Sequence, residues 1–149
     1  MIAKELMNKD VVTVTPDNTV EEVAQILKDK RISGLPVINA QEKLVGIISE
    51  GDLVFQQKRI NSPVFFALFD GIFQLGQQQF YEEIKKIAAF KVEDLMSKDV
   101  ISVQPDTDVV EIATTMIEND INRVPVVDNS NKLVGIITRH DIIKNMYTV

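Results

Sequence analysis

The hydrophobic and polar positions of the chain follow two periodicities in turn. Apolar runs and alternation typical of strands give way to apolar residues at helical spacing, and turn residues separate these segments. In order, the pattern predicts a strand at 11–14, a turn at Pro16-Asp17, a helix with apolar residues at 20, 23, 24 and 27, strands at 35–38 and 44–49 around a polar turn, and a helix from near Asp52. The predicted order is therefore β-α-β-β-α.

The same succession occurs twice because the sequence is duplicated. Residues 6–53 align without a gap with residues 95–142, at an offset of 89, and 21 of these 48 positions are identical. A unit of about 50 residues buries too little surface to be stable alone. We therefore expect an α+β fold in which two β-α-β-β-α repeats pack with pseudo-two-fold symmetry and form two related clefts. The strands at 44–48 and 133–137 are apolar on both faces, which favours cover on both sides.

The first long helix of each copy has a recognisable start and an apolar stripe. Thr19 with Glu22 fits a capping box, and Asp108 with Glu111 is the counterpart in the second copy. The stripe of the second copy consists of Val109, Ile112, Ala113, Met116 and Ile117.

Each copy also carries the pattern S/T-x-x-D between its last strand and its last helix, as Ser49 to Asp52 and as Thr138 to Asp141. One interpretation is a structural capping box, in which the hydroxyl caps the helix. The other is a ligand site, because a hydroxyl and backbone N–H groups at a helix start can receive a phosphate and a nearby carboxylate can accept hydrogen bonds from a ribose. The two interpretations are compatible.

Cationic residues occur near this pattern in the second copy only. Arg123, Arg139 and His140 stand where the first copy has Gly34, Glu50 and Gly51. Arg123 is interpreted either as a partner in a surface salt bridge or as part of a phosphate-binding cluster with Arg139 and Thr138. A structural role, close packing or the shaping of strand entry, is expected for Gly46, Gly135, Pro36 and Pro125.

The two copies are separated by an asymmetric segment. The predicted division is repeat 1 at 1–60, a helical insertion or linker at 61–94 and repeat 2 at 95–149. Five of the seven phenylalanines lie within 65–80, in two predicted amphipathic helices. We expect this segment to mediate homodimerisation; the alternatives are packing on its own module, or a surface for a different partner or for a membrane.

Composition excludes several classes of function. The net charge of −6 disfavours binding to nucleic acid, and the absence of cysteine excludes thiolate metal sites. A single histidine argues against a metal site, and no nucleophile with its base is visible, so no catalytic residue and no enzyme activity are predicted. The longest apolar run, 64–69, is too short to span a membrane, and residues 1–10 lack the long apolar core that is typical of a signal peptide. We expect a soluble cytoplasmic protein.

The two hairpins resemble a known family. The first copy contains PVIN followed by LVGIISEGD, and the second contains PVVD followed by LVGIITRHD. A tandem of these patterns resembles a pair of CBS domains, the Bateman module, over about two thirds of the chain. The resemblance implies the β-α-β-β-α fold and clefts that bind an adenosyl ligand: AMP, ADP, ATP or S-adenosylmethionine. No catalytic cofactor is expected.

The resemblance also implies two unequal ligand sites. The stronger cleft would comprise Thr19, Ala24, Leu44, Val45, Arg123, Thr138, Arg139, His140 and Asp141, with Asp141 on the ribose hydroxyls. The weaker cleft would comprise Ser49, Asp52, Asp108, Ala113, Leu133 and Val134. It lacks the hydroxyl of Thr19 and the cationic residues Arg123 and His140, and we expect it to hold a polyphosphate less well.

Three functions are compatible with these residues. The first is a regulatory module that binds an adenosyl ligand and signals to an unidentified effector protein by a conformational or oligomeric change. The second is a structural or interaction module with vestigial clefts, dimerising through the insertion. The third, a nucleotide-processing enzyme, is disfavoured because no nucleophile or metal cluster is visible.

Overall fold

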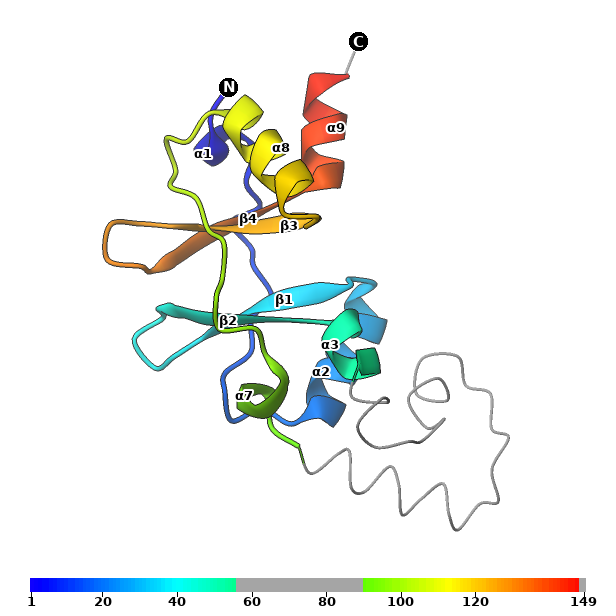
Figure 1. Ribbon diagram of the computed structural model, residues 1–149. Helices are drawn as coiled ribbons and strands as arrows, with labels where there is room; N and C mark the ends of the chain where they lie inside the picture. The colour runs from blue at the N-terminus through cyan, green and yellow to red at the C-terminus, as the bar shows by residue number, and fades with distance from the viewer. Residues whose placement is uncertain (56–89, 148–149) are drawn as a thin grey trace. The chain divides into compact units, whose positions relative to one another are not determined.

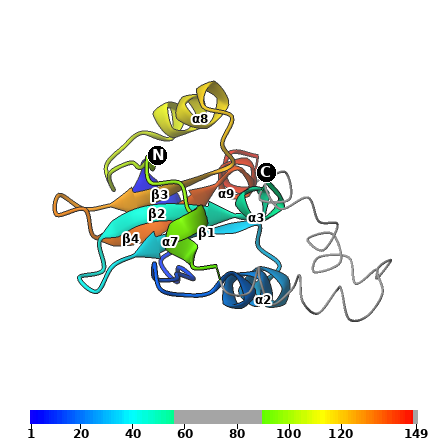
Figure 2. The same cartoon turned by 60° about the horizontal axis from the view of Figure 1, so that its bottom comes forward.

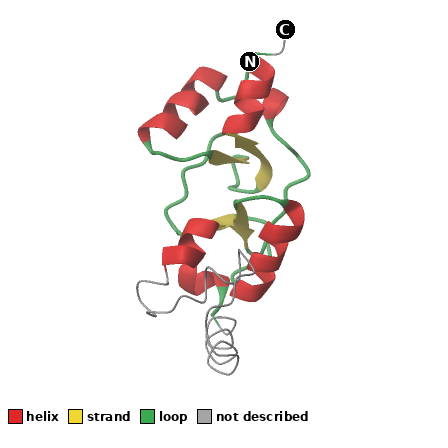
Figure 3. Cartoon of the chain, turned by 90° about the vertical axis from the view of Figure 1, so that its right-hand side faces the viewer, coloured by secondary structure: helices red, strands yellow, loops and turns green. Residues whose placement is uncertain are grey.

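The computed structural model describes residues 1–55 and 90–147 and divides the chain into two compact units. Unit 1 comprises residues 1–12, 38–44 and 99–149, and unit 2 comprises residues 13–37 and 45–98. In each unit the helices gather on one side of a two-stranded hairpin (Figure 3). The α+β class and the duplicated β-β-α core that the sequence predicts are confirmed.

Unit 2 is built mainly from the first repeat. Its elements are α2 (Val20–Lys30), β1 (Gly34–Ile38), β2 (Leu44–Ser49), α3 (Glu50–Phe55) and α7 (Val92–Leu95), the ends of β1 and β2 nearest their shared turn falling in unit 1. α3 continues directly from β2 (Figure 2). The apolar stripe of α2 places Val20, Val23 and Leu27 in the core, where they are at most 3% exposed. The helix ends at Lys30, and the C-cap residue Arg31 adopts a left-handed conformation with a φ of 53°.

Unit 1 is built mainly from the second repeat. Its elements are α1 (Ala3–Leu6), α8 (Val109–Glu118), β3 (Arg123–Val127), β4 (Leu133–Thr138) and α9 (Arg139–Met146). β3 and β4 are antiparallel, with Val124 opposite Ile137, and α8 and α9 pack beside each other next to this hairpin (Figure 1). The core contains Ala3, Leu6, Val109, Ile112, Met116, Val124, Val126, Ile137 and Ile142.

The opening segment of each repeat packs in the unit built from the other repeat. In unit 1, Asn8 exchanges two backbone hydrogen bonds of 2.9 and 3.0 Å with Ile136 of β4. In unit 2, Ser97 exchanges two hydrogen bonds of 2.9 and 3.0 Å with Ile47 of β2. The short helices α1 and α7 precede these contacts, and they bury Ala3 and Val92 completely. Neither core is therefore made from one repeat alone.

Two glycines permit these opening segments to approach the strands. A Cβ on Gly135 would lie 2.5 Å from the Sδ atom of Met7, and a Cβ on Gly46 would lie 2.5 Å from the Sδ atom of Met96. Both distances are far below ordinary van der Waals contact. The expected packing role of the two glycines is confirmed, and the methionine at the start of each repeat is the neighbour that requires it.

Several details differ from the sequence-based expectation. The strand predicted at 11–14 and its counterpart at 100–103, 89 residues later, are reduced to single parallel bridges, Val14 with Val37 and Val103 with Val126. Only one residue of each segment pairs with the neighbouring hairpin strand, so no ladder forms. The strand β2 alternates between fully and partly buried residues, so its second face is only half covered.

Two predictions about α8 are wrong. Ile117 is 75% exposed, because the buried stripe runs through Val109, Ile112 and Met116 and Ile117 lies beside it. Asp108 caps the helix through the backbone N–H of Val110 at 2.8 Å, one position earlier than a capping box requires. The predicted helices between 61 and 89 lie outside the described residues.

Candidate functional site

The junction between β4 and α9 fixes the carboxylate of Asp141. The backbone N–H and the hydroxyl of Thr138 both donate to Asp141 Oδ2, at 2.8 and 2.7 Å, and the backbone N–H of Asp141 donates to Thr138 Oγ1 at 3.2 Å. Both side chains are half-buried. The capping-box interpretation is therefore confirmed, and it holds the carboxylate in one orientation beside the first turn of a helix.

The first repeat has the same arrangement between β2 and α3. The backbone N–H of Ser49 donates to Asp52 Oδ2 at 2.9 Å, and its hydroxyl donates to the same oxygen at 3.3 Å. The hydroxyl contact is longer than the 2.7 Å contact of Thr138, so the side-chain bond of the second repeat is the better formed.

The cationic residues of the second junction differ in their surroundings. The guanidinium of Arg139 donates from Nε to the carbonyl of Ile121 at 3.1 Å and lies 3.7 Å from the exposed carboxylate of Asp120. His140 is exposed on α9, and Arg123 is half-buried at the start of β3. Arg139 thus contacts the loop before β3, and an anion could bind its guanidinium only in competition with these contacts.

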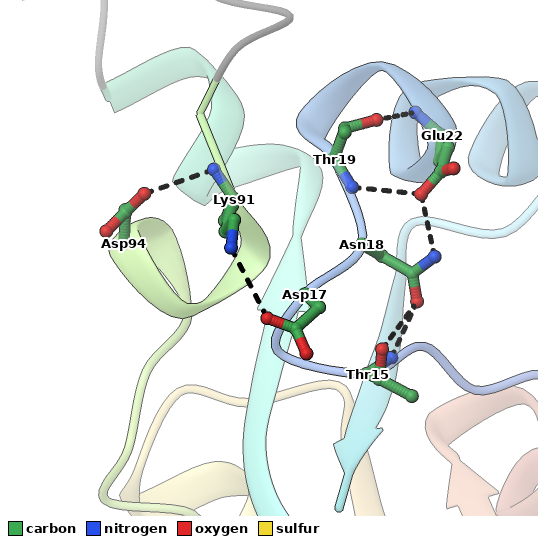
Figure 4. Close-up of polar contacts among 7 residues, drawn as sticks. All are labelled: Thr15, Asp17, Asn18, Thr19, Glu22, Lys91 and Asp94. Carbon is green, nitrogen blue, oxygen red and sulfur yellow. Dashed lines mark hydrogen bonds and ion pairs between the residues drawn. The ribbon is translucent and has the colours of Figure 1, made fainter.

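Thr19 caps α2 in unit 2. Its hydroxyl accepts a hydrogen bond from the backbone N–H of Glu22 at 3.2 Å, and its own N–H donates to Glu22 Oε2 at 2.9 Å (Figure 4). The Asn18 side chain also donates to this carboxylate, at 2.7 Å. The Asn18 amide and, to a lesser extent, the Thr19 N–H lower the pKa of Glu22 below its usual value. The capping box predicted for Thr19 is confirmed.

The segment before α7 reaches the same helix start. Lys91 pairs with Thr19 in an antiparallel bridge, and its ammonium group lies 3.4 Å from the carboxylate of Asp17 (Figure 4). The backbone N–H of Val20 donates to the carbonyl of Phe90 at 3.0 Å. This contact was not predicted, because α7 is only four residues long and its counterpart α1 precedes the detectable repeat.

The predicted apolar residues lie on strands and helices of both units. Leu44 is 7% exposed at the start of β2, while Val45 and Ala24 are half-buried. In unit 1, Leu133, Val134 and Ala113 are half-buried, and Asp108 is exposed.

The structure brings together some members of each predicted cleft. Arg123, Thr138, Arg139, His140 and Asp141 occur in unit 1, and so does Leu44. Thr19, Ala24 and Val45 occur in unit 2. The weaker set is divided in the same way, with Ser49 and Asp52 in unit 2 and Asp108, Ala113, Leu133 and Val134 in unit 1. A cleft that joins the members of either set stays a prediction.

Residues 1–55 and 90–147 contain no group of three or more His, Cys, Asp or Glu side chains that could hold a metal ion. In the same part of the chain, none of the helices has the length and apolar character needed to cross a bilayer.

The duplicated hairpins and junctions match a known protein family. The CBS domain model matches residues 3–58 and 92–148, both repeats together with their opening segments. The chain belongs to the CBS domain family. The tandem arrangement makes it a CBS pair, and the match begins at α1 and α7, which the sequence repeat alone had not included.

Relatives of the CBS pair include proteins from archaea and plants. Protein MJ1426 of Methanocaldococcus jannaschii is 37% identical over 97% of this chain and 90% of its own length. Several other curated relatives are longer, and this chain spans 23 to 61% of their length.

Two solved CBS pairs have the same fold over nearly their whole length. The crystal structure of CBSX2 of Arabidopsis thaliana in complex with AMP has a TM-score of 0.74 and 26% identity, and the match covers 97% of this chain and 95% of that one. The CBS domain pair of protein MJ0100, in complex with 5′-methylthioadenosine and S-adenosyl-L-methionine, has a TM-score of 0.72 and 26% identity, with 98% and 95% covered.

Proposed function

We propose that this CBS pair is a non-catalytic regulatory module that binds an adenosyl ligand between its two repeats. The observation that carries the proposal is the full-length likeness to the AMP complex of CBSX2. AMP, 5′-methylthioadenosine and S-adenosylmethionine share adenine and a ribose ring with its two hydroxyls, and they differ in the group at the 5′ carbon. The common requirement is therefore a site for adenine and ribose, and the 5′ group varies.

The two aspartates at the strand-to-helix junctions are the proposed ribose ligands. A carboxylate whose orientation is already fixed can accept hydrogen bonds from both ribose hydroxyls at a lower ordering cost. Hydrogen bonds from Thr138 fix the orientation of the Asp141 carboxylate, and hydrogen bonds from Ser49 do so for Asp52 with a longer hydroxyl contact. This difference supports the proposal that the Asp141 cleft is the tighter of the two.

The 5′ group would meet the start of α9. Arg123 and His140 occur only in the second repeat, so a phosphate is proposed to bind on that side. Because Arg139 already contacts Ile121 and Asp120, we propose it as a weaker phosphate ligand than Arg123. The adenine would rest against Ala24, Leu44 and Val45 from the first repeat.

A thermal-shift screen tests the proposal. Purified protein would be heated with AMP, ADP, ATP, S-adenosylmethionine and 5′-methylthioadenosine, and with GMP as a control. A ligand at 100 times its dissociation constant adds about 2.7 kcal/mol, which raises the melting temperature of a chain of this size by roughly 5–10 °C. If none of the five adenosyl compounds raises it, the interaction module with vestigial clefts becomes the better explanation.

Site-directed variants then distinguish the clefts. Asp141→Ala is expected to lower the affinity for AMP more than Asp52→Ala does, measured by isothermal titration calorimetry. Equal losses, or no loss from Asp141→Ala, would contradict the proposed assignment.

The output is proposed to pass to an effector protein or through a homodimer. The dimer proposal rests on the phenylalanine-rich sequence at 65–80, which lies outside the described residues. Deleting residues 61–86 is expected to halve the mass measured in solution by light scattering, and an unchanged mass would refute this role.

A further inference from the structure

The turns of the two hairpins are built alike. In the first turn, the side-chain oxygen of Asn39 accepts backbone N–H groups two and four residues later, each at 3.0 Å. In the second turn, Asp128 does the same at 2.8 and 3.0 Å. Both turns end in a residue with a φ of 62°, Glu42 in the first and Asn131 in the second. The two turns are therefore matched copies of one Asx-type turn.

These turns pair with each other inside unit 1. The backbone N–H of Leu44 donates to the carbonyl of Asn131 at 3.0 Å, and the backbone N–H of Leu133 donates to the carbonyl of Glu42 at 3.2 Å. The two bonds are equivalent under the 89-residue offset of the duplication. The backbone contribution of the two repeats to this contact is thus symmetric.

The side chains break this symmetry. The Nδ2 atom of Asn131 donates to the carbonyl of Leu44 at 2.9 Å, so Leu44 is bound through both of its backbone groups. Glu42 has no donor to offer Leu133, and its carboxylate lies 3.2 Å from the exposed ammonium of Lys132. Leu44 is 7% exposed and Leu133 is only half-buried. Leu44 at the start of β2 is therefore held more firmly than its counterpart Leu133 at the start of β4.

We propose that Asn131 is a positioning residue, which fixes Leu44 in the stronger cleft and contributes to the inequality of the two clefts. The inference rests on the proposed function, because Leu44 contacts adenine only in that proposal. Fixing a binding residue before the ligand arrives removes an ordering cost from binding. The loss of one neutral hydrogen bond corresponds to about a three- to tenfold change in affinity.

The test uses the full chain in two backgrounds. Asp52→Ala leaves the stronger cleft to be titrated with AMP, and Asp141→Ala leaves the weaker one. Into each we would introduce Asn131→Gly, which keeps a residue suited to positive φ and removes only the side-chain donor. Circular dichroism and the melting temperature verify that the variants fold. Lys132→Gln is the control at the same turn, because it removes only an exposed ion pair.

In the Asp52→Ala background, which reports on the stronger cleft, Asn131→Gly is expected to weaken AMP binding about three- to tenfold. In the Asp141→Ala background, which reports on the weaker cleft, the affinity for AMP should change by less than about twofold. Unchanged affinity in both, or an equal loss in both, would overturn the inference and show a purely structural role. Glu42→Asn provides the reverse test, because it gives Leu133 the missing donor and should tighten the weaker cleft. If the wild-type chain binds no adenosyl compound, the proposed function fails, and the positioning role fails with it.

Discussion

A methyl group added at Gly135 measures how closely the first opening segment packs on β4. The new Cβ would lie 2.5, 2.8 and 2.9 Å from the Sδ, Cγ and Cβ atoms of Met7. Rotation of the methionine can move its sulfur, but its Cβ moves only with the backbone. That backbone is fixed by the paired hydrogen bonds of Asn8 with Ile136. Overpacking of a core costs about 1–3 kcal/mol, and this geometry indicates a value of about 2–3 kcal/mol.

The duplication supplies a graded comparison. At Gly46 the added Cβ would meet Met96 Sδ at 2.5 Å and Cγ at 3.0 Å, with the Ser97 carbonyl at 3.2 Å, so a smaller loss of about 1–2 kcal/mol is expected. At Gly51 in α3, the contact is 3.4 Å to the Ser49 hydroxyl, and alanine there should stabilise the helix by about 0.5–1 kcal/mol.

Urea unfolding followed by circular dichroism gives the stability of each variant. The predicted order of stability is Gly51→Ala, wild type, Gly46→Ala and then Gly135→Ala. Met7→Ala removes the Sδ and Cγ contacts but keeps the 2.9 Å contact of its own Cβ, so it should remove only part of the penalty at Gly135, and a double-mutant cycle should yield a coupling of about 1 kcal/mol. Additive effects in this cycle, or a Gly135→Ala variant as stable as Gly51→Ala, would refute the packing argument.

Three further predictions concern single side chains. Because the pKa of Glu22 is lowered by folding, its carboxylate stabilises the folded chain fully at a pH above the ordinary glutamate pKa, and this contribution is lost as the pH falls through the lowered value. The stability difference between wild type and Glu22→Gln, measured by urea titration, should therefore shrink on acidification. A difference that stays constant with pH would contradict this expectation. Ile117→Lys, which introduces the residue found at Lys28 in the first repeat, should change stability by less than about 0.5 kcal/mol because Ile117 is 75% exposed; a larger thermal destabilisation would show that this position is covered. Thr138→Ala should cost about 1 kcal/mol by removing a helix cap, and Thr138→Ser should retain most of it in calorimetric unfolding; equal losses would assign the effect to the methyl group.

The hairpins were predictable because their signals are local. The turn at Asn39, the apolar strand at 44–49 and the S/T-x-x-D pattern each occupy consecutive residues, and the structure has them where the sequence places them. Repetition strengthened each signal by supplying a second instance. The junction at Thr138 was predicted as a capping box for the same reason, and its two backbone-to-side-chain hydrogen bonds are present.

The missed features depend on residues far apart in the sequence. The short helices α1 and α7 have too few residues to show a period, and their stability comes from contacts such as that of Val92 with the loop before α2. The strand expected at 11–14 has three valines around Thr13, but only Val14 has a strand partner. The hydrogen bond from the Asn131 side chain to Leu44 joins residues that are 87 apart in the sequence, so no local pattern could predict it.

The exchange of opening segments constrains how this protein can be divided. A fragment beginning at residue 95 would retain the second hairpin and its helices, but it would lack Ala3 and Leu6, which belong to its core. The surface of Gly135 that Met7 covers would then face water. Expression of half the chain should therefore give a fragment that folds only when the other half, or a second fragment able to donate the same arm, is supplied.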